Sequence, residues 1–478
     1  MLFNSFAFAL FLPIVFAVYW WACRSLRSRN GLVLLASWFF YAWWDWRFLG
    51  LLILSTAGDY FLGLAISRTE HSIRRKWLLG ASIGLNLGLL GFFKYFDFFI
   101  AGLADVIAAF GMQPHLPVLH VVLPVGISFY TFQTLSYAID IYRRQLEPTR
   151  DFVAFAAFVS FFPQLVAGPI ERAANLLPQF LQPRALQLDR AKDGLRQMLW
   201  GFFKKIAVAD ALAPLVDGIF SGDTATTPGI TLFFGAFFFA FQIYCDFSGY
   251  SDIAIGCARL FGFSLSRNFN YPYFSRNLGE FWRRWHISLS TWFRDYLYIP
   301  LGGNRGGRTR TFGNRLVTFG VSGFWHGANW SFAGWGIAHG LLHSGGIRKS
   351  RITINDRTRT EVPGLRDLPA IMTTFLIVTL TWVLFRSSSL SEGGQFLWSM
   401  AANALQSPGA VLLHLGRAEL ILLIAMIAAE WRARTQEHAL AVLPQSAIAR
   451  WLLYLIIGLI TLSQFDLRTQ HAFIYFQF

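Results

Sequence analysis

The sequence predicts an all-α, polytopic integral membrane protein, with about twelve membrane-crossing helices plus re-entrant and interfacial helices around a central cavity. Of its 478 residues, 55% are hydrophobic and only 14% are charged, and the mean hydropathy is +0.44. A chain of this size with so little polar surface is not a soluble protein. The basic residues lie in short blocks between apolar runs, so the net charge of +15 indicates a lipid bilayer and argues against a nucleic-acid partner.

The first half of the chain reads as spans separated by basic blocks. The apolar run 2–23 comes before the first basic residue, Arg24, which indicates an uncleaved span that runs from outside to inside. Pro163 and the pair Gly168-Pro169 would interrupt a regular helix. The further expected elements are a two-span hairpin over 31–67, a span over 77–96, an apolar return to about 110, a span over 119–142, a broken or re-entrant element over 152–170 and a cytoplasmic or interfacial helix over 172–205.

The second half places polar residues inside apolar runs. The run 229–256 contains Asp246, Ser248, Ser251 and Asp252, and such groups at membrane depth should face a cavity or one another. Ten arginines between 259 and 315 place that stretch on the cytoplasmic side. The remaining expected elements are an interfacial helix over 282–300, a segment over 312–346 that leaves and returns to a basic side with glycines near residue 326, a span over 368–385 and a hairpin over 420–431 and 451–462. Both termini are expected outside.

His326 is the leading candidate for chemistry, because it lies in the motif FWHGANW (324–330) within an apolar segment. We expect Trp325 and Trp330 to form walls around the imidazole and Asn329 to offer hydrogen bonds near it. A neutral imidazole in a partly dry cavity can act as a base during acyl transfer to a hydroxyl. The plainer interpretation is a buried histidine that bonds to a carbonyl. His286, which follows Trp282 in the motif FWRRWHIS, supplies a second candidate.

No metal site is predicted, and no bound cofactor. His339 and His343 stand four residues apart on one helical face, but no third ligand is evident. The glycine-rich loop 302–308 lacks the spacing of a nucleotide-binding P-loop. Such a basic loop could still contact a phosphate-bearing donor, or it could be a flexible cytoplasmic loop. The residues expected on the donor side are Arg294, Tyr298, Asn304 and Arg305.

Seven motifs occur along the chain, in the order MLFNS (1–5), LPVGISF (123–129), QLVAGPI (164–170), FWRRWHIS (281–288), FRDYLYIPLGGNR (293–305), FWHGANW (324–330) and FIYF (473–476). In these motifs the chain resembles the membrane-bound O-acyltransferase family, and most closely its alginate O-acetyltransferase branch. The resemblance covers nearly the whole length. It implies one domain over 1–478, with N-terminal spans (1–150), a catalytic core (151–346) and C-terminal spans with an aromatic tail (347–478).

The resemblance also implies an activity. His326 matches the family's catalytic histidine, and His286 matches a second histidine of its bacterial branch. An acyl group, expected to be acetyl, would pass from acetyl-CoA or an acyl carrier in the cytoplasm across the inner membrane to an extracytoplasmic polysaccharide such as alginate. A separate periplasmic acetyltransferase and an exopolysaccharide synthesis complex would be its partners.

Tyr475 lies in an aromatic tail that the charge pattern places outside. A tyrosine hydroxyl needs a base to become a nucleophile at neutral pH, and His326 could be that base, which would make Tyr475 an acyl relay. The alternative is an interfacial aromatic anchor.

Two other functions stay open at the level of sequence. One is a D-alanyl transferase of teichoic acid, although no carrier-docking surface can be identified. The other is a transporter that uses the buried His and Asp residues, although no internal repeat of the WHG or DFSGYSD segments is found.

Overall fold

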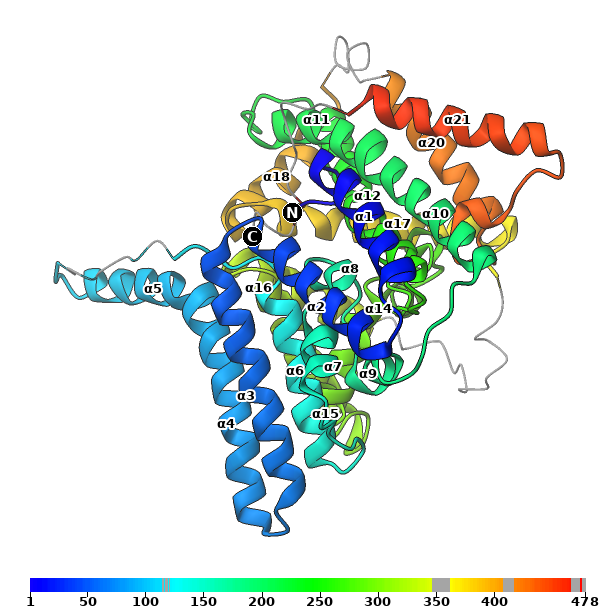
Figure 1. The fold of residues 1–478 in the computed structure, drawn as a ribbon. Helices are drawn as coiled ribbons and strands as arrows, with labels where there is room; N and C mark the ends of the chain where they lie inside the picture. Colours follow the sequence, from blue (N-terminus) through cyan, green and yellow to red (C-terminus); the bar gives the residue numbers. More distant parts are fainter. Residues whose placement is uncertain are drawn as a thin grey trace. The chain divides into compact units, whose positions relative to one another are not determined.

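The computed structural model describes residues 1–113, 116, 119, 121–345, 362–406, 417–465 and 473–474, and every regular element among them is helical (Figure 1). Four helical runs of this described part are long and apolar enough to cross a membrane: Trp46–Arg68, Ser72–Ala109, Gly229–Leu260 and Leu365–Arg386. Shorter apolar helices cover Phe6–Ala22, Phe152–Leu165 and Ala447–Ser463. The helical fold class is confirmed, while the count of about twelve spans stays a prediction.

Backbone contacts divide the chain into two compact units. Unit 1 comprises Met1–Gly194 with Cys257–Ser266, and unit 2 comprises Leu195–Gly256 with Arg267–Phe478. Unit 1 contains α1 (Phe6–Ala17), η1 (Val18–Ala22), α2 (Leu26–Ala42), η2 (Trp46–Phe48), α3 (Leu49–Arg68), α4 (Ser72–Leu90), η3 (Gly91–Tyr95), α5 (Phe96–Ala109), α6 (Ile127–Tyr142), α7 (Phe152–Val159), α8 (Phe162–Leu165) and α9 (Ala173–Phe180).

Buried polar side chains join the helices of unit 1. Asn86 of α4 donates to the Asp59 carboxylate of α3 at 2.7 Å and accepts from the Thr134 hydroxyl of α6 at 2.9 Å. Because an unpaired buried polar group costs about 1–3 kcal/mol, these bonds fix how the three helices pair. The gap between α7 and α8 confirms the broken element expected over 152–170.

Two expectations for unit 1 are wrong. Residues 97–109 do not return along α4, because helical hydrogen bonding continues through η3 and α5 then diverges from α4 (Figure 1). The helix expected from 119 begins only at Ile127, after Pro124 and after Gly126, whose φ of 77° lies in the left-handed region.

Unit 2 contains most of the site candidates. Its elements are α10 (Leu188–Phe202, which begins in unit 1), η4 (Phe203–Asp210), α11 (Ala211–Phe220), α12 (Gly229–Leu260, which ends in unit 1), η5 (Pro272–Phe274), α13 (Leu278–Arg284), α14 (Ile287–Phe293), η6 (Arg294–Tyr298), α15 (Gly307–His326), α16 (Trp330–Gly345), η9 (Leu365–Asp367), α17 (Leu368–Arg386), α18 (Leu390–Ala402), α20 (Arg417–Arg432), η10 (Ala439–Ala441) and α21 (Ala447–Ser463).

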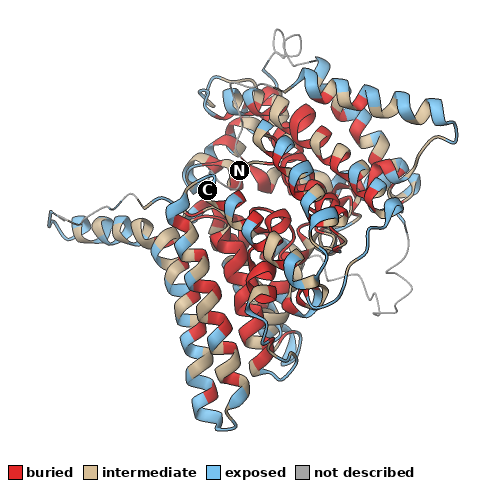
Figure 2. Cartoon of the chain, in the orientation of Figure 1, coloured by how far each residue is buried: buried red, intermediate tan, exposed pale blue. Residues whose placement is uncertain are grey.

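Helix α12 is a core helix, whereas the long α4 run is not. In the most apolar window of α12, 72% of the residues are buried inside the protein, against 6% for the run Ser72–Ala109 (Figure 2). The polar residues on α12 are therefore surrounded by protein.

Glycines allow α15 and α16 to pack as a close hairpin. An added Cβ at Gly323 would overlap the carbonyl oxygen of Phe332, and one at Gly336 would overlap that of Phe319. The close packing predicted from these glycines is confirmed, and the hairpin turns directly after His326.

Candidate functional site

His286 lies in a break between two short helices. The sequence predicted one interfacial helix over 282–300, but α13 ends at Arg284 and α14 begins at Ile287. His286 itself has φ 41° and ψ 55°, a left-handed conformation that is uncommon for a residue other than glycine. Its side chain is buried, with 1% exposed. The surrounding contacts must therefore hold the residue in this conformation.

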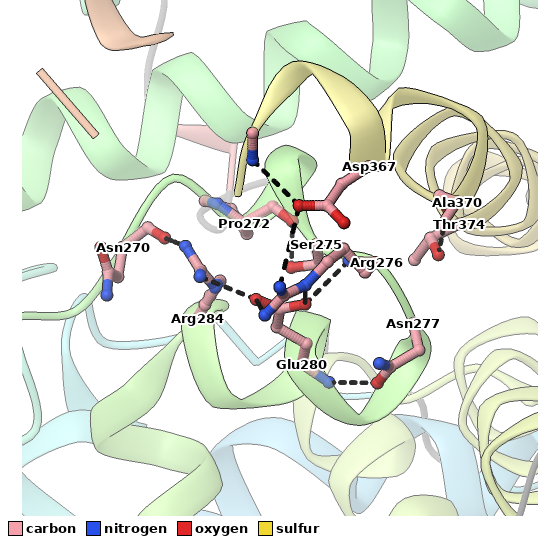
Figure 3. Close-up of polar contacts among 11 residues, drawn as sticks. Asn270, Pro272, Ser275, Arg276, Asn277, Glu280, Arg284, Asp367, Ala370 and Thr374 are labelled. Carbon is pink, nitrogen blue, oxygen red and sulfur yellow. Dashed lines mark hydrogen bonds and ion pairs between the residues drawn. The ribbon is translucent and has the colours of Figure 1, made fainter. Parts of the chain in front are cut away.

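A charged network fixes the segment before His286 (Figure 3). Glu280 of α13 accepts from Arg276 at 3.0 Å and from Arg284 at 2.7 Å. Arg284 also donates to the carbonyl of Asn270 at 3.3 Å, and the Asn277 side chain accepts from the Glu280 backbone N–H at 2.9 Å, which caps α13. The loop 268–277 is thus tied to the turn that carries His286.

The imidazole of His286 contacts one polar side chain and three aromatic rings. Its Nδ1 lies 3.1 Å from Oδ1 of Asn268. The Phe247 ring meets it edge-on at 4.6 Å, and Phe269 and Trp325 lie at 6.4 and 6.2 Å between ring centroids. His286 is outside the candidate membrane spans, and burial lowers its pKa to about 3, so the imidazole is neutral at physiological pH.

His326 ends α15 and is also buried, with 3% exposed. Its ring lies 5.0 Å from Trp325, 5.4 Å from Trp335 and 5.3 Å from Phe385. The indole ring of Trp325 therefore contacts both candidate histidines. Trp330, which was expected to form a second wall, is instead 65% exposed. Trp335, five residues further along α16, lies against His326 but was not predicted.

Asn329 and Trp282 have different surroundings from those expected. The Asn329 amide donates to the Ser388 carbonyl at 2.6 Å and accepts from the Ser331 N–H at 2.9 Å, so it caps α16. The Trp282 ring contacts Trp335 at 5.7 Å and His339 at 5.0 Å. Trp282 thus supports the aromatic wall beside His326, and Asn329 shapes the turn that follows it.

The carboxylates of α12 are paired with two buried lysines. Asp246 lies 2.6 Å from Lys205, and Asp252 lies 2.7 Å from Lys204. Lys204 also donates to Ser248 at 2.9 Å. These polar groups were expected to face a cavity or one another. Ser248, Ser251 and Asp252 do line a pocket, but the carboxylates pair with lysines that were not predicted. A signal was present, because Lys204-Lys205 stands between Phe203 and an apolar run (206–209).

Two further carboxylates belong to this cluster. Asp210 of η4 lies 2.6 Å from Lys205. Glu430 of α20 lies 3.6 Å from Lys204 and accepts from the Tyr244 hydroxyl at 2.8 Å. The cluster lines a pocket, and the residues on its wall include Lys204, Ser248, Ser251, Asp252, Asn268 and Glu430. Asn268 therefore lies both on the wall of this polar pocket and against His286.

The four residues expected on the donor side lie on η6 and the following loop. Arg294 is paired with Asp295 at 2.6 Å, Tyr298 is half-buried, and Asn304 and Arg305 are exposed. Gly302, Gly303, Gly306 and Gly307 all have positive φ in this loop. Asn314 donates to the Gly303 carbonyl at 2.9 Å, which ties the loop to α15.

The C-terminal tail reaches α12 through two described residues. The backbone N–H of Ile474 donates to Asp246 at 2.7 Å. The Phe473 ring lies 5.4 Å from Phe247, which itself contacts His286, and 5.0 Å from Tyr250. Tyr475 lies outside the described residues.

Comparison with known proteins identifies relatives over most of the chain. Residues 142–353 match the model of MBOAT, the membrane-bound O-acyltransferase family. The chain is 42% identical to the probable alginate O-acetylase of Azotobacter vinelandii, over 87% of this chain and 80% of that protein. The corresponding protein of Pseudomonas aeruginosa is 43% identical over 83% and 73%. The peptidoglycan O-acetyltransferase of Helicobacter pylori is 37% identical over 84% and 80%.

Proposed function

We propose that this chain, which belongs to the membrane-bound O-acyltransferase family and is an O-acyltransferase, passes an acetyl group across the bacterial inner membrane for O-acetylation of an extracytoplasmic polysaccharide. The donor is a cytoplasmic thioester, acetyl-CoA or an acyl carrier. The acceptor class follows the names of the relatives, which include alginate O-acetylases. The observation that carries the proposal is the pair of buried imidazoles, His286 and His326, that contact the same indole ring of Trp325.

A buried imidazole suits the proton transfers of acyl transfer. A hydroxyl oxygen attacks the carbonyl carbon of the thioester, the imidazole takes the hydroxyl proton, and the carbon–sulfur bond breaks. The proton then passes to the departing thiolate, which leaves as a thiol. His326 is the proposed base, and His286, whose neutral imidazole contacts the same Trp325 ring, supports the same chemistry.

The tail supplies the proposed first acceptor, Tyr475. Its neighbour Ile474 is hydrogen-bonded to Asp246, and Phe473 contacts Phe247, the ring that meets His286. These contacts support a tail that enters the site. The acetyl group would rest on the Tyr475 oxygen as a phenyl ester and would then pass to the acceptor, with a periplasmic acetyltransferase of the synthesis complex as partner.

The donor is proposed to meet the basic glycine loop. Arg305 is exposed there and Arg294 lies on the preceding turn, so the loop offers cations to the phosphates of coenzyme A. Asp246 and Asp252 pair with Lys205 and Lys204, and these ion pairs fix the core helix α12 against η4.

The test is transfer of label from radioactive acetyl-CoA to the purified protein in nanodiscs. Wild type is compared with His326→Ala, Tyr475→Phe and a matched control, His343→Ala, whose ring packs on Phe319 at 5.6 Å and has no role in the proposed chemistry. General acid–base assistance is worth about 10²- to 10⁴-fold in rate. We expect labelling of wild type and the control, and its loss in both other variants.

Each contrary outcome points to another interpretation. Equal labelling of wild type, His326→Ala and Tyr475→Phe would exclude the histidine-activated tail. Labelling only from a D-alanyl carrier protein would favour teichoic acid as acceptor, and substrate counterflow in liposomes without labelling would favour a transporter. Label that moves to peptidoglycan rather than to exopolysaccharide would place this chain with the Helicobacter relative.

A further inference from the structure

Asn268 is a completely buried amide at the junction of His286, α12 and α14. Its Oδ1 lies 3.1 Å from Nδ1 of His286, 2.9 Å from the Ser288 hydroxyl and 3.4 Å from the Ser288 backbone nitrogen. Its Nδ2 donates to the Ser251 hydroxyl of α12 at 3.3 Å. The amide is thus held from both ends.

These contacts decide which nitrogen of His286 carries the proton. A backbone N–H can only donate, so the Asn268 atom that faces Ser288 N must be the oxygen. An amide oxygen can only accept, so the neighbouring Nδ1 of His286 must donate. In a neutral imidazole the other nitrogen, Nε2, then carries the lone pair. Among the described residues Nε2 of His286 has no hydrogen-bond partner.

We propose that Asn268 is a positioning residue that fixes His286 as the Nδ1-protonated tautomer and thereby makes Nε2 the nitrogen that exchanges protons during acyl transfer. The inference rests on the proposed function and adds to it the state of the second histidine. The backbone supports the same geometry, because Ile287 N–H donates to the Asn268 carbonyl at 2.9 Å directly after the left-handed His286. Ring orientation and tautomer are therefore set by one residue.

The charged groups near His286 do not set its tautomer in place of Asn268. The elements packed around it carry several ionisable groups, namely Asp246 and Asp252 on α12, Lys204, Lys205 and Asp210 on η4, Arg267 and Arg284 beside the turn, and His326 on α15. The two aspartates of α12 are paired with the two lysines. Because the Asn268 amide is neutral, it selects one tautomer of His286 without a negative charge that would favour the protonated imidazole.

The first test is the pH dependence of acetyl transfer in three variants of the full chain. Asn268→Leu removes the acceptor, and we expect kcat to fall on the order of 10²-fold at every pH, with little change in KM. Asn268→Asp keeps an acceptor but adds a negative charge, which favours the protonated imidazole, so the acidic limb of the profile should move to higher pH. The control Asn30→Asp changes another buried amide, in unit 1, and should leave the profile in place.

The second test reads the tautomer directly and does not depend on activity. Nitrogen-15 spectra of histidine-labelled protein in liposomes, with His286→Gln to assign the signal, should show a protonated Nδ1 and an unprotonated Nε2 in wild type. A protonated Nε2 in wild type, or an unchanged signal in Asn268→Leu, would overturn the proposal. If the protein shows the expected tautomer but transfers no acyl group from any donor, the proposed function is wrong, while Asn268 still fixes the tautomer of His286.

Discussion

Replacement of Lys204 by methionine tests whether the buried charge cluster holds unit 2 together. The Lys204 ammonium is 3% exposed and lies 2.7 Å from Asp252, 3.6 Å from Glu430 and 2.9 Å from the Ser248 hydroxyl. Glu430, at 4% side-chain exposure, would lose its cation, whereas Asp252 keeps a hydrogen bond from Gln197 at 2.8 Å. A buried pair broken from one side costs about 3–5 kcal/mol. We expect a loss of that size in the free energy of unfolding.

The assay is equilibrium unfolding in mixed micelles with increasing SDS, followed by tryptophan fluorescence. Lys192→Met is the matched control, because the side chain of Lys192 is 63% exposed and its partner Asp189 is fully exposed. The control should change stability by less than about 0.5 kcal/mol. The double variant Lys204→Met/Glu430→Gln removes the stranded carboxylate and should recover part of the loss. If Lys204→Met and Lys192→Met unfold at the same SDS concentration, the cluster does not stabilise the protein.

Three further outcomes follow from the site geometry. Trp325→Leu, which removes the ring shared by the two histidines, should lower acetyl transfer by about 10-fold or more, whereas Trp330→Leu at an exposed position should be milder in a labelling assay. Gly323→Ala would overlap a backbone carbonyl of α16 and should lower the thermal midpoint, while Gly320→Ala, whose nearest neighbour lies at 3.7 Å, should not. Because burial lowers the pKa of His286 to about 3, its imidazole should take up no proton as pH falls through about 6.5, and a nitrogen-15 signal of His286 that changes there would contradict the neutral, buried ring.

The sequence predicts most accurately those helices whose position depends on the pattern of apolar residues alone. The runs 229–256 and 368–385 correspond to α12 and α17, and the glycines after residue 320 correspond to the close turn of α15 and α16. Polar residues inside α12 were expected to face a cavity or one another. Three of them line a pocket, and the two aspartates pair with buried lysines instead of with other α12 residues.

The predictions that failed depend on contacts between distant segments. Nothing at Trp285-His286 resembles a helix stop, because neither glycine nor proline is present. The break there depends on Asn268, which receives the Ile287 N–H and the imidazole from a separate loop. Lys204 and Lys205 were expected on a cytoplasmic or interfacial helix for a similar reason. Asp210, which pairs with Lys205, is five positions away, but the other carboxylate partners of the two lysines are 41 or more positions away on α12 and α20.

The core helix α12 links the polar cluster, the tail and the second histidine. Asp246 receives the tail through the Ile474 N–H, and Ser251, five residues along the same helix, receives the amide of Asn268 that orients His286. Between them, Ser248 accepts from Lys204. Because one buried helix bears all three contacts, a shift of α12 would displace the tail and the imidazole together. The lysine pairs are therefore expected to matter for acyl transfer even though no lysine takes part in the chemistry.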